Sequence, residues 1–348
     1  MFLTRSNFLR FCAAILVLPL IPSLFAAENN ASWSFGIMPD TQWKTNVPFH
    51  GTAIHVIDAI NAEFIRHKVE FVIQVGDLVE TPSRIAFQTR ATRNRLLDNA
   101  GIKFYPVRGN HDADGLESIA WYKAAFPNLP GTLGASGNSP NLPGAAGMTY
   151  SFTHKGGTFI LLDTYPLVND GSRSGKAYTV GDYLPWIESE LKKSDHQFAL
   201  VFAHENLRGQ SHRGSNLFGN SGSRSNPELQ NAFIGSLQQT GVRYFICGHD
   251  HMYHRSRLGS PDGQSEVIQI ICGNASDKSY VPYRSSFRSF FRGETPIAQD
   301  LHRIGFMIVR VENNRIRFEY YSTEPFGDVP KTPTWELRDS FEYTREYL

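Results

Sequence analysis

The sequence has few cysteines, almost no net charge and no cluster of basic residues. Its 348 residues include three cysteines, and 34 Lys and Arg residues stand against 33 Asp and Glu residues, a formal net charge of +1. So few cysteines exclude a fold held together by many disulfides. A balanced charge without a Lys/Arg run gives no indication of a nucleic-acid partner. A chain of this length can instead bury a large hydrophobic core.

Long apolar runs are also scarce, and the one that exists lies at the N-terminus. Two arginines precede it, residues 11–24 are almost wholly apolar, and Ala26 and Ala27 are small enough for a cleavage site. This pattern is typical of a secretory signal peptide. We therefore predict a signal peptide over residues 1–27, an exported protein (periplasmic or secreted) and no transmembrane span after the signal peptide. An imperfect cleavage site leaves an uncleaved anchor open as the alternative.

Removal of the signal peptide leaves two cysteines. Cys247 and Cys272 each end a strand-like run. An oxidising compartment permits a disulfide between them if their strands are neighbours, and two buried free thiols are the alternative. Their spacing does not match a zinc site.

Short apolar runs rich in Val, Ile and Phe recur along the chain, and many are separated by segments with a helical, 3.6-residue period. The runs are typical of buried strands. The predicted elements are strands at 34–38, 71–75, 104–107, 198–203 and 244–247, helices at 53–67, 85–99, 184–193 and 229–240, and a C-terminal hairpin of 305–311 with 315–321. This alternation predicts one α/β domain over residues 31–348. Three stretches rich in Gly, Pro, Ser, Asn or Arg, at 127–147, 206–226 and 277–300, are predicted to be functional rims or mobile segments.

Carboxylate, amide and imidazole side chains follow five of these strands. Open α/β sheets bind ligands beyond the carboxyl ends of their strands. His249 and His251 are two residues apart and project to the same side of an extended segment, so each can bind one of two metal ions about 3.5–4 Å apart. Asp77 can bridge such ions, and Asn110 and Asp40 add oxygen ligands. Mixed oxygen and imidazole ligands favour Zn, Fe or Mn over calcium.

These residues resemble successive motifs of the calcineurin-like metallophosphoesterases. The motifs are Gly76-Asp77-x-x-Glu80, Gly109-Asn110-His111-Asp112, His204 and Gly248-His249-Asp250-His251, and they stand in the order of that family. Their span, from Asp40 to His251, covers nearly two-thirds of the chain. The segment after Gly248 is also similar to the branch that contains the purple acid phosphatases. Glu80 weakens that second likeness, because it replaces the tyrosine of that branch.

The resemblance implies a four-layer αββα sandwich with mixed central sheets and two metal ions (Fe, Mn or Zn). It implies hydrolysis of small-molecule phosphomonoesters or phosphodiesters by a metal-bridging hydroxide. When the family's ligand roles are transferred to the matching residues of this sequence, the resemblance implies that Asp77 bridges the ions. Asp40 and His251 complete one metal site, and Asn110, His204 and His249 complete the other.

The resemblance also implies that His111 is the general acid that protonates the leaving group, and that the carboxylate of Glu80 orients it. One departure concerns the family's first motif, usually Asp-x-His, which is Asp40-Thr41-Gln42 here. Gln42 offers only a neutral amide oxygen as a ligand. This leaves open an inactive exported binding protein of the same fold, beside a phosphodiesterase specific for nucleotides or lipid head groups.

Two residues beside the motifs have competing interpretations. Arg108 either contacts phosphate or forms an ordinary surface ion pair. Asp112 is expected to cap the following segment rather than bind a metal ion.

Overall fold

The computed structural model describes residues 32–44, 50–132, 135–169, 171, 175–193, 197–212, 215–219, 226–282, 294–313, 315–326 and 331–344. The predicted signal peptide lies outside these residues. Residues 32–348 form one compact unit. Within the described ranges, no helix has both the length and the apolar character needed to cross a membrane.

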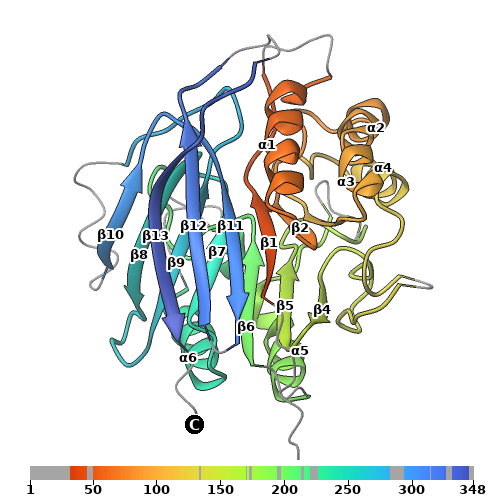
Figure 1. Cartoon of the computed structure of the whole chain (residues 1–348). Helices are drawn as coiled ribbons and strands as arrows, with labels where there is room; N and C mark the ends of the chain where they lie inside the picture. Colours follow the sequence, from red (N-terminus) through yellow and green to blue (C-terminus); the bar gives the residue numbers. More distant parts are fainter. Residues whose placement is uncertain are drawn as a thin grey trace, which may run out of the picture. The chain divides into compact units, whose positions relative to one another are not determined.

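The first of two mixed β-sheets carries the N-terminal strands (Figure 1). Its order is β13-β12-β11-β1-β2-β3, made of β1 (Trp33–Met38), β2 (Phe71–Val75), β3 (Lys103–Val107), β11 (Ile304–Glu312), β12 (Arg315–Thr323) and β13 (Glu336–Thr344). Strands β1, β2 and β3 run parallel, whereas β11 and β12 form the predicted C-terminal hairpin. The carboxyl ends of β1, β2 and β3 therefore meet at one edge of the sheet.

The second sheet has the order β10-β8-β9-β7-β6-β5-β4. Its strands are β4 (Tyr150–His154), β5 (Gly157–Leu162), β6 (Phe198–Ala203), β7 (Tyr244–Cys247), β8 (Met252–Gly259), β9 (Glu266–Gly273) and β10 (Glu294–Asp300). Strands β5, β6 and β7 are parallel neighbours, so their carboxyl ends also lie together.

Aromatic side chains join the two sheets. Phe35 of β1 stacks on Phe71 of β2 with ring centroids 5.0 Å apart, and it meets Phe159 of β5 edge-on at 5.2 Å. All three rings are almost completely buried. Such pairs add about 0.5–1.5 kcal/mol beyond the burial of their apolar area, so this layer fixes how the sheets face each other.

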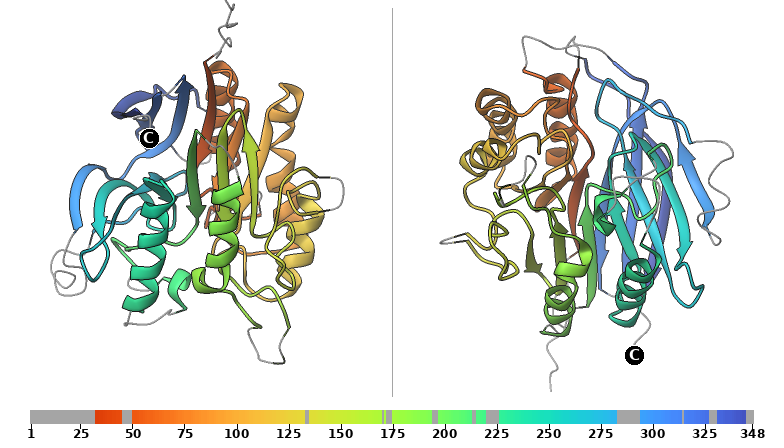
Figure 2. Two further views of the ribbon diagram at one scale, coloured as in Figure 1. Left: turned by 90° about the horizontal axis from the view of Figure 1, so that it is seen from below. Right: turned by 180° about the vertical axis from the view of Figure 1, so that it is seen from behind.

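Helices cover the outer face of each sheet. The helices are α1 (Ile54–Arg66), α2 (Arg84–Thr92), α3 (Arg95–Asn99), α4 (Glu117–Ala125), α5 (Val180–Lys193) and α6 (Pro227–Gln239). Helix α1 contacts β1 and α3 contacts β3, whereas α5 and α6, side by side in green and teal in Figure 2, contact β5 and β9. The predicted four-layer αββα sandwich with mixed sheets is confirmed.

Several element boundaries differ from the sequence-based expectation. The helix predicted over 85–99 is broken into α2 and α3 at Asn94, whose side chain accepts a hydrogen bond from the buried guanidinium of Arg90 at 2.8 Å. Helix α5 begins four residues before the predicted start, where the carboxylate of Asp182 accepts from both the backbone N–H and the hydroxyl of Thr179. Strand β10 lies inside the stretch 277–300 that was predicted to be irregular.

Candidate metal centre

The ends of five strands from both sheets meet at the candidate site. Asp40 follows β1, Asp77 follows β2, Asn110 follows β3, His204 follows β6, and His249 and His251 follow β7. Hydrogen bonds and short contacts link all seven predicted metal ligands, including Gln42. Residues up to 211 positions apart in the sequence therefore converge, as the motif order predicted.

Three of the predicted ligands have unusual backbone conformations. Asp77, His249 and His251 have positive φ angles of 46°, 70° and 46°. Non-glycine residues rarely adopt this left-handed region, and such strain is concentrated at functional sites. Hydrogen bonds between the motifs hold these backbone conformations in place. The backbone N–H of His111 donates to Asp77 Oδ1, and that of His249 donates to Asp40 Oδ1, both at 2.9 Å.

Two glycines of the motifs make room for the carboxylates. A Cβ atom on Gly109 would lie 2.1 Å from Asp77 Oδ1, and one on Gly248 would lie 2.6 Å from Asp40 Oδ2. Both distances are far below a van der Waals contact. The Gly-Asn and Gly-His pairs therefore place their backbones against the two aspartates.

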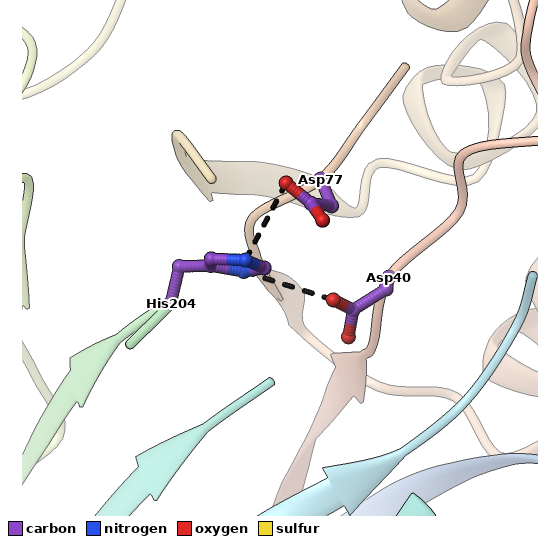
Figure 3. A group of neighbouring side chains, drawn as sticks. All are labelled: Asp40, Asp77 and His204. Carbon is purple, nitrogen blue, oxygen red and sulfur yellow. Dashed lines mark ion pairs between the residues drawn. The ribbon is translucent and has the colours of Figure 1, made fainter. Parts of the chain in front are cut away.

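Asp40, Asp77 and His204 form a buried group whose ligand atoms all lie within 4.8 Å of one another. Figure 3 shows both carboxylates turned toward the ring of His204. Burial of the Asp40 carboxylate, together with the nearby charge of Asp77, raises the pKa of Asp40 well above its ordinary value. A cation between the two carboxylates would offset both effects. The group thus fits a metal ion.

A second set of ligand atoms converges around His204. Its Nδ1 lies 2.9 Å from the carbonyl oxygen of Val75 and donates to it, so Nε2 of the neutral ring carries a lone pair. That Nε2 lies 3.0 Å from Asn110 Oδ1 and 3.1 Å from His249 Nδ1. Burial lowers the pKa of His204, which favours the neutral, metal-binding form. A metal ion between His204 Nε2, Asn110 Oδ1 and His249 Nδ1 would accept the lone pairs of these atoms.

Gln42 lies between Asp77 and His251. Its amide nitrogen donates to Asp77 Oδ2 at 2.8 Å and is 3.0 Å from His251 Nε2. Burial lowers the pKa of His251 to about 3, so this ring is neutral at pH 7. Gln42 Oε1 and Asp40 Oδ2 are buried without a hydrogen-bond partner among the described residues. With the Gln42 amide turned over, its oxygen would face His251 Nε2 and Asp77 Oδ2, and these acceptors fit a second ion.

His111 lies beside this ligand set, but Glu80 holds it differently from the prediction. His111 Nδ1 is 2.7 Å from the main-chain carbonyl oxygen of Glu80 and 3.7 Å from its carboxylate. The carboxylate instead forms an ion pair with Lys278 Nζ at 2.6 Å. The main chain of Glu80, rather than its side chain, therefore fixes the His111 tautomer with the proton on Nδ1.

The sequence-based reasoning missed three residues at the site. Lys278 Nζ lies 3.3 Å from His111 Nε2, and the ring of Tyr280 lies 5.0 Å from that of His251. His212 Nδ1 is 2.6 Å from Asp250 Oδ1, which holds the His212 ring 4.2 Å from that of His249. All three missed residues belong to stretches predicted to be functional rims, which was the only signal that pointed to them.

Two expectations about neighbouring residues are wrong. Arg108 neither faces the site nor lies on the surface: it is buried, with Nε and one terminal nitrogen on the carboxylate of Asp163 at 2.7 and 3.2 Å. Asp112 does not cap the segment after it. Its carboxylate accepts from the backbone N–H groups of Leu78 and Gly109, at 3.0 and 2.8 Å, and so joins the loops that carry Asp77 and Asn110.

Cys247 and Cys272 are buried free thiols, the second of the two alternatives. The residue opposite Cys247 on the neighbouring strand is Ile271. Because successive residues of a strand project to opposite faces, Cys272 projects away from Cys247.

The family model for calcineurin-like phosphoesterases matches residues 36–253, more than half of the chain. The chain belongs to this family. This family implies a dinuclear metal centre, and the buried group of Asp40, Asp77 and His204 fits such a centre.

Solved structures agree with the fold of this phosphoesterase. A purple acid phosphatase from yellow lupin seeds is 16% identical with a TM-score of 0.59, over 91% of this chain and 55% of that one. This chain thus spans about half the length of the lupin protein. GAP50, the anchor in the inner membrane complex of Plasmodium, is 17% identical with a TM-score of 0.55, over 91% of this chain and 90% of that one. A dimetal phosphatase from Danio rerio is 15% identical with a TM-score of 0.50, over 88% and 99%. No curated protein sequence matches the chain.

Proposed function

We propose that this phosphoesterase hydrolyses small phosphomonoesters or phosphodiesters by in-line attack of hydroxide on phosphorus. The observation that carries the proposal is the convergence of seven ligand side chains at the ends of five strands. They are Asp40, Gln42, Asp77, Asn110, His204, His249 and His251. Bound metal ions supply hydroxide at neutral pH and neutralise the phosphoryl oxygens.

The two oxygens of Asp77 support a bridging role for this residue. Oδ1 faces His204 Nε2 at 3.4 Å, within the set that includes Asn110 and His249. Oδ2 faces Gln42, which in turn contacts His251. Each oxygen of one carboxylate is thus directed to a different ligand set. The mixture of imidazole and oxygen ligands favours Fe, Mn or Zn.

His111 is proposed to protonate the oxygen of the leaving group. Its Nδ1 is engaged by the Glu80 carbonyl, so Nε2 is the nitrogen that can carry and deliver a proton. As the P–O bond breaks, its electron pair passes to the leaving oxygen, which receives this proton. A fixed ring orientation makes such a transfer effective because the proton then travels along a defined path.

Asp77→Ala tests the metal centre. We expect it to lose both metal ions and phosphatase activity, because each ligand set loses an oxygen. Elemental analysis of the purified protein, together with hydrolysis of nitrophenyl phosphate, measures this. Asp98→Ala, which removes an exposed carboxylate, is the matched control. Full activity of the Asp77 variant refutes the bridging assignment.

His111→Ala tests the general acid. We expect it to keep both ions and to lose about 10²–10⁴-fold in kcat for alkyl phosphates, whose leaving groups need a proton. Nitrophenyl phosphate, whose leaving group departs without one, should be affected far less. Equal losses for both substrates remove the acid role. Hydrolysis of nitrophenyl phosphate compared with its bis ester decides between monoester and diester preference.

Export of the protein is also proposed, on the pattern of residues 1–27. N-terminal sequencing of the protein recovered outside the cytoplasm should begin near residue 28. Recovery of the intact chain from the cytoplasm contradicts export, and recovery of the intact chain from membranes supports the uncleaved anchor.

A further inference from the structure

We infer that Lys278 contacts the substrate and places its ammonium charge against the leaving-group oxygen. This inference rests on the proposed role of His111 as general acid. Lys278 Nζ lies 3.3 Å from His111 Nε2 and 2.6 Å from Glu80 Oε2. An oxygen that takes a proton from Nε2 therefore lies within reach of Nζ as well.

The main chain of Lys278 is fixed by a turn that begins at Asn274. Asn274 Oδ1 accepts from the backbone N–H of Ser276 at 2.9 Å, and Ser276 Oγ accepts from that of Lys278 at 3.2 Å. The Asn274 amide also donates to the Lys278 carbonyl oxygen at 2.7 Å. The backbone N–H and carbonyl groups of Ser276 and Lys278 are thus engaged, so the origin of the long side chain is held in one place.

The same turn is attached to the metal ligands. The Lys278 carbonyl oxygen lies 3.3 Å from His251 Nδ1, and the backbone N–H of Ala275 donates to the carbonyl oxygen of Asp40 at 3.0 Å. One residue therefore holds a predicted metal ligand with its main chain and reaches the predicted acid with its side chain. This arrangement sets the distance between the ammonium group and the metal centre.

The charge of Lys278 is positioned before substrate arrives. Its ammonium group forms an ion pair with Glu80 Oε2 at 2.6 Å and lies 3.3 Å from His111 Nε2. When His111 carries a proton on Nε2, both it and Lys278 are donors, and a substrate oxygen between them is the acceptor that both require. Positive charge held where negative charge develops lowers the barrier without reorganisation. Lys278 keeps all of its protons, and His111 supplies the one that is transferred.

The ion pair between Lys278 and Glu80 is less exposed to solvent than an ordinary surface ion pair of the same chain. Lys155 pairs with Glu70, and their side chains are 49% and 32% exposed. The side chains of Lys278 and Glu80 are only 17% and 18% exposed. Exposed pairs contribute little to stability, whereas a shielded charge at the site interacts strongly with a substrate oxygen. Lys155→Met therefore serves as the matched control.

The test measures kcat of Lys278→Met for a series of aryl and alkyl phosphates with leaving groups of increasing pKa. We expect a loss of about 100-fold for alkyl phosphates and a small loss for nitrophenyl phosphate, so that log kcat falls more steeply with leaving-group pKa. Lys278→Arg should restore most of the activity, because it restores the charge. Metal content should stay at two ions per chain, since the main-chain carbonyl on His251 is retained.

A uniform loss across the series, or loss of metal with an unchanged slope, means a structural role and overturns the inference. Failure of Lys278→Arg to restore the slope also overturns it. If the Met variant does not fold, Lys278→Gln, which keeps length and polarity, replaces it. If log kcat falls more steeply with leaving-group pKa in His111→Ala but not in Lys278→Met, the role of Lys278 is refuted and that of His111 is retained. If the slope of log kcat against leaving-group pKa is unchanged in His111→Ala, the proposed role of His111 as general acid is refuted.

Discussion

Replacing Asp112 with alanine should release the two loops that carry Asp77 and Asn110. The Asp112 carboxylate accepts from three backbone N–H groups, those of Leu78, Val79 and Gly109, at distances between 2.8 and 3.1 Å. Alanine offers no acceptor, so three buried donors lose their partners. A buried donor without a partner costs about 1–3 kcal/mol, which gives roughly 3–9 kcal/mol in total.

The lower end of that range applies to Asp112→Ala. Burial, together with the nearby charge of Asp77, raises the pKa of Asp112 to about 8. In the metal-free protein at pH 7 the carboxyl group is therefore largely neutral, and its hydrogen bonds lack the extra strength of charged ones. We expect a loss of about 3 kcal/mol in the free energy of unfolding.

Urea denaturation of the metal-free protein, followed by circular dichroism, measures this loss. Asp114→Ala, two residues along the chain and exposed, is the control and should unfold like the parent. A change below about 0.5 kcal/mol for Asp112→Ala, the level expected of an ordinary surface substitution, combined with full metal content, refutes the view that this carboxylate holds the loops together.

Three further perturbations have defined outcomes. Arg108→Met should cost about 3–5 kcal/mol in urea denaturation because it leaves Asp163 buried without its cation, and the added change Asp163→Leu should recover part of that loss. Gly36→Ala should cost about 1–3 kcal/mol by overpacking, since its new Cβ would lie 2.5 Å from a ring carbon of Phe64. A chelator should lower Tm by roughly 8 °C. Two ions at free concentrations 100 times their Kd contribute about 5 kcal/mol to the stability of a domain of about 300 residues. An unchanged Tm in calorimetry contradicts a metal centre in the folded protein.

The strands and ligands could be predicted from the sequence because each ligand stands directly after a buried strand. An apolar run such as 71–75 identifies the strand, and Gly76-Asp77 after it identifies a turn with a carboxylate at the sheet edge. Strand β2 matches its predicted range of 71–75. Strands β4, β8, β10 and β13 were not predicted, because their polar and apolar residues do not form uniformly buried runs. Strand β5 is uniformly buried and was not predicted either.

The contacts around His111 could not be predicted in the same way. The resemblance implied that the carboxylate of Glu80 orients His111, but the main-chain oxygen of Glu80 makes the close contact with the ring. That choice depends on Lys278, which lies 167 residues from His111 in the sequence and competes for the carboxylate. A lysine in a polar loop carries no local signal of its partners, so only the folded chain reveals the competition.

The candidate site also couples metal binding to the pairing of the two sheets. Asp40, Asp77 and Asn110 follow strands of the first sheet, whereas His204 and His249 follow strands of the second. Each proposed ion would therefore be held by residues from both sheets, and so would bind only where the sheets are already packed face to face. Binding free energy gained in this way stabilises the folded domain as a whole rather than one loop. For this reason chelation should shift a single cooperative unfolding transition, instead of producing a separate early one.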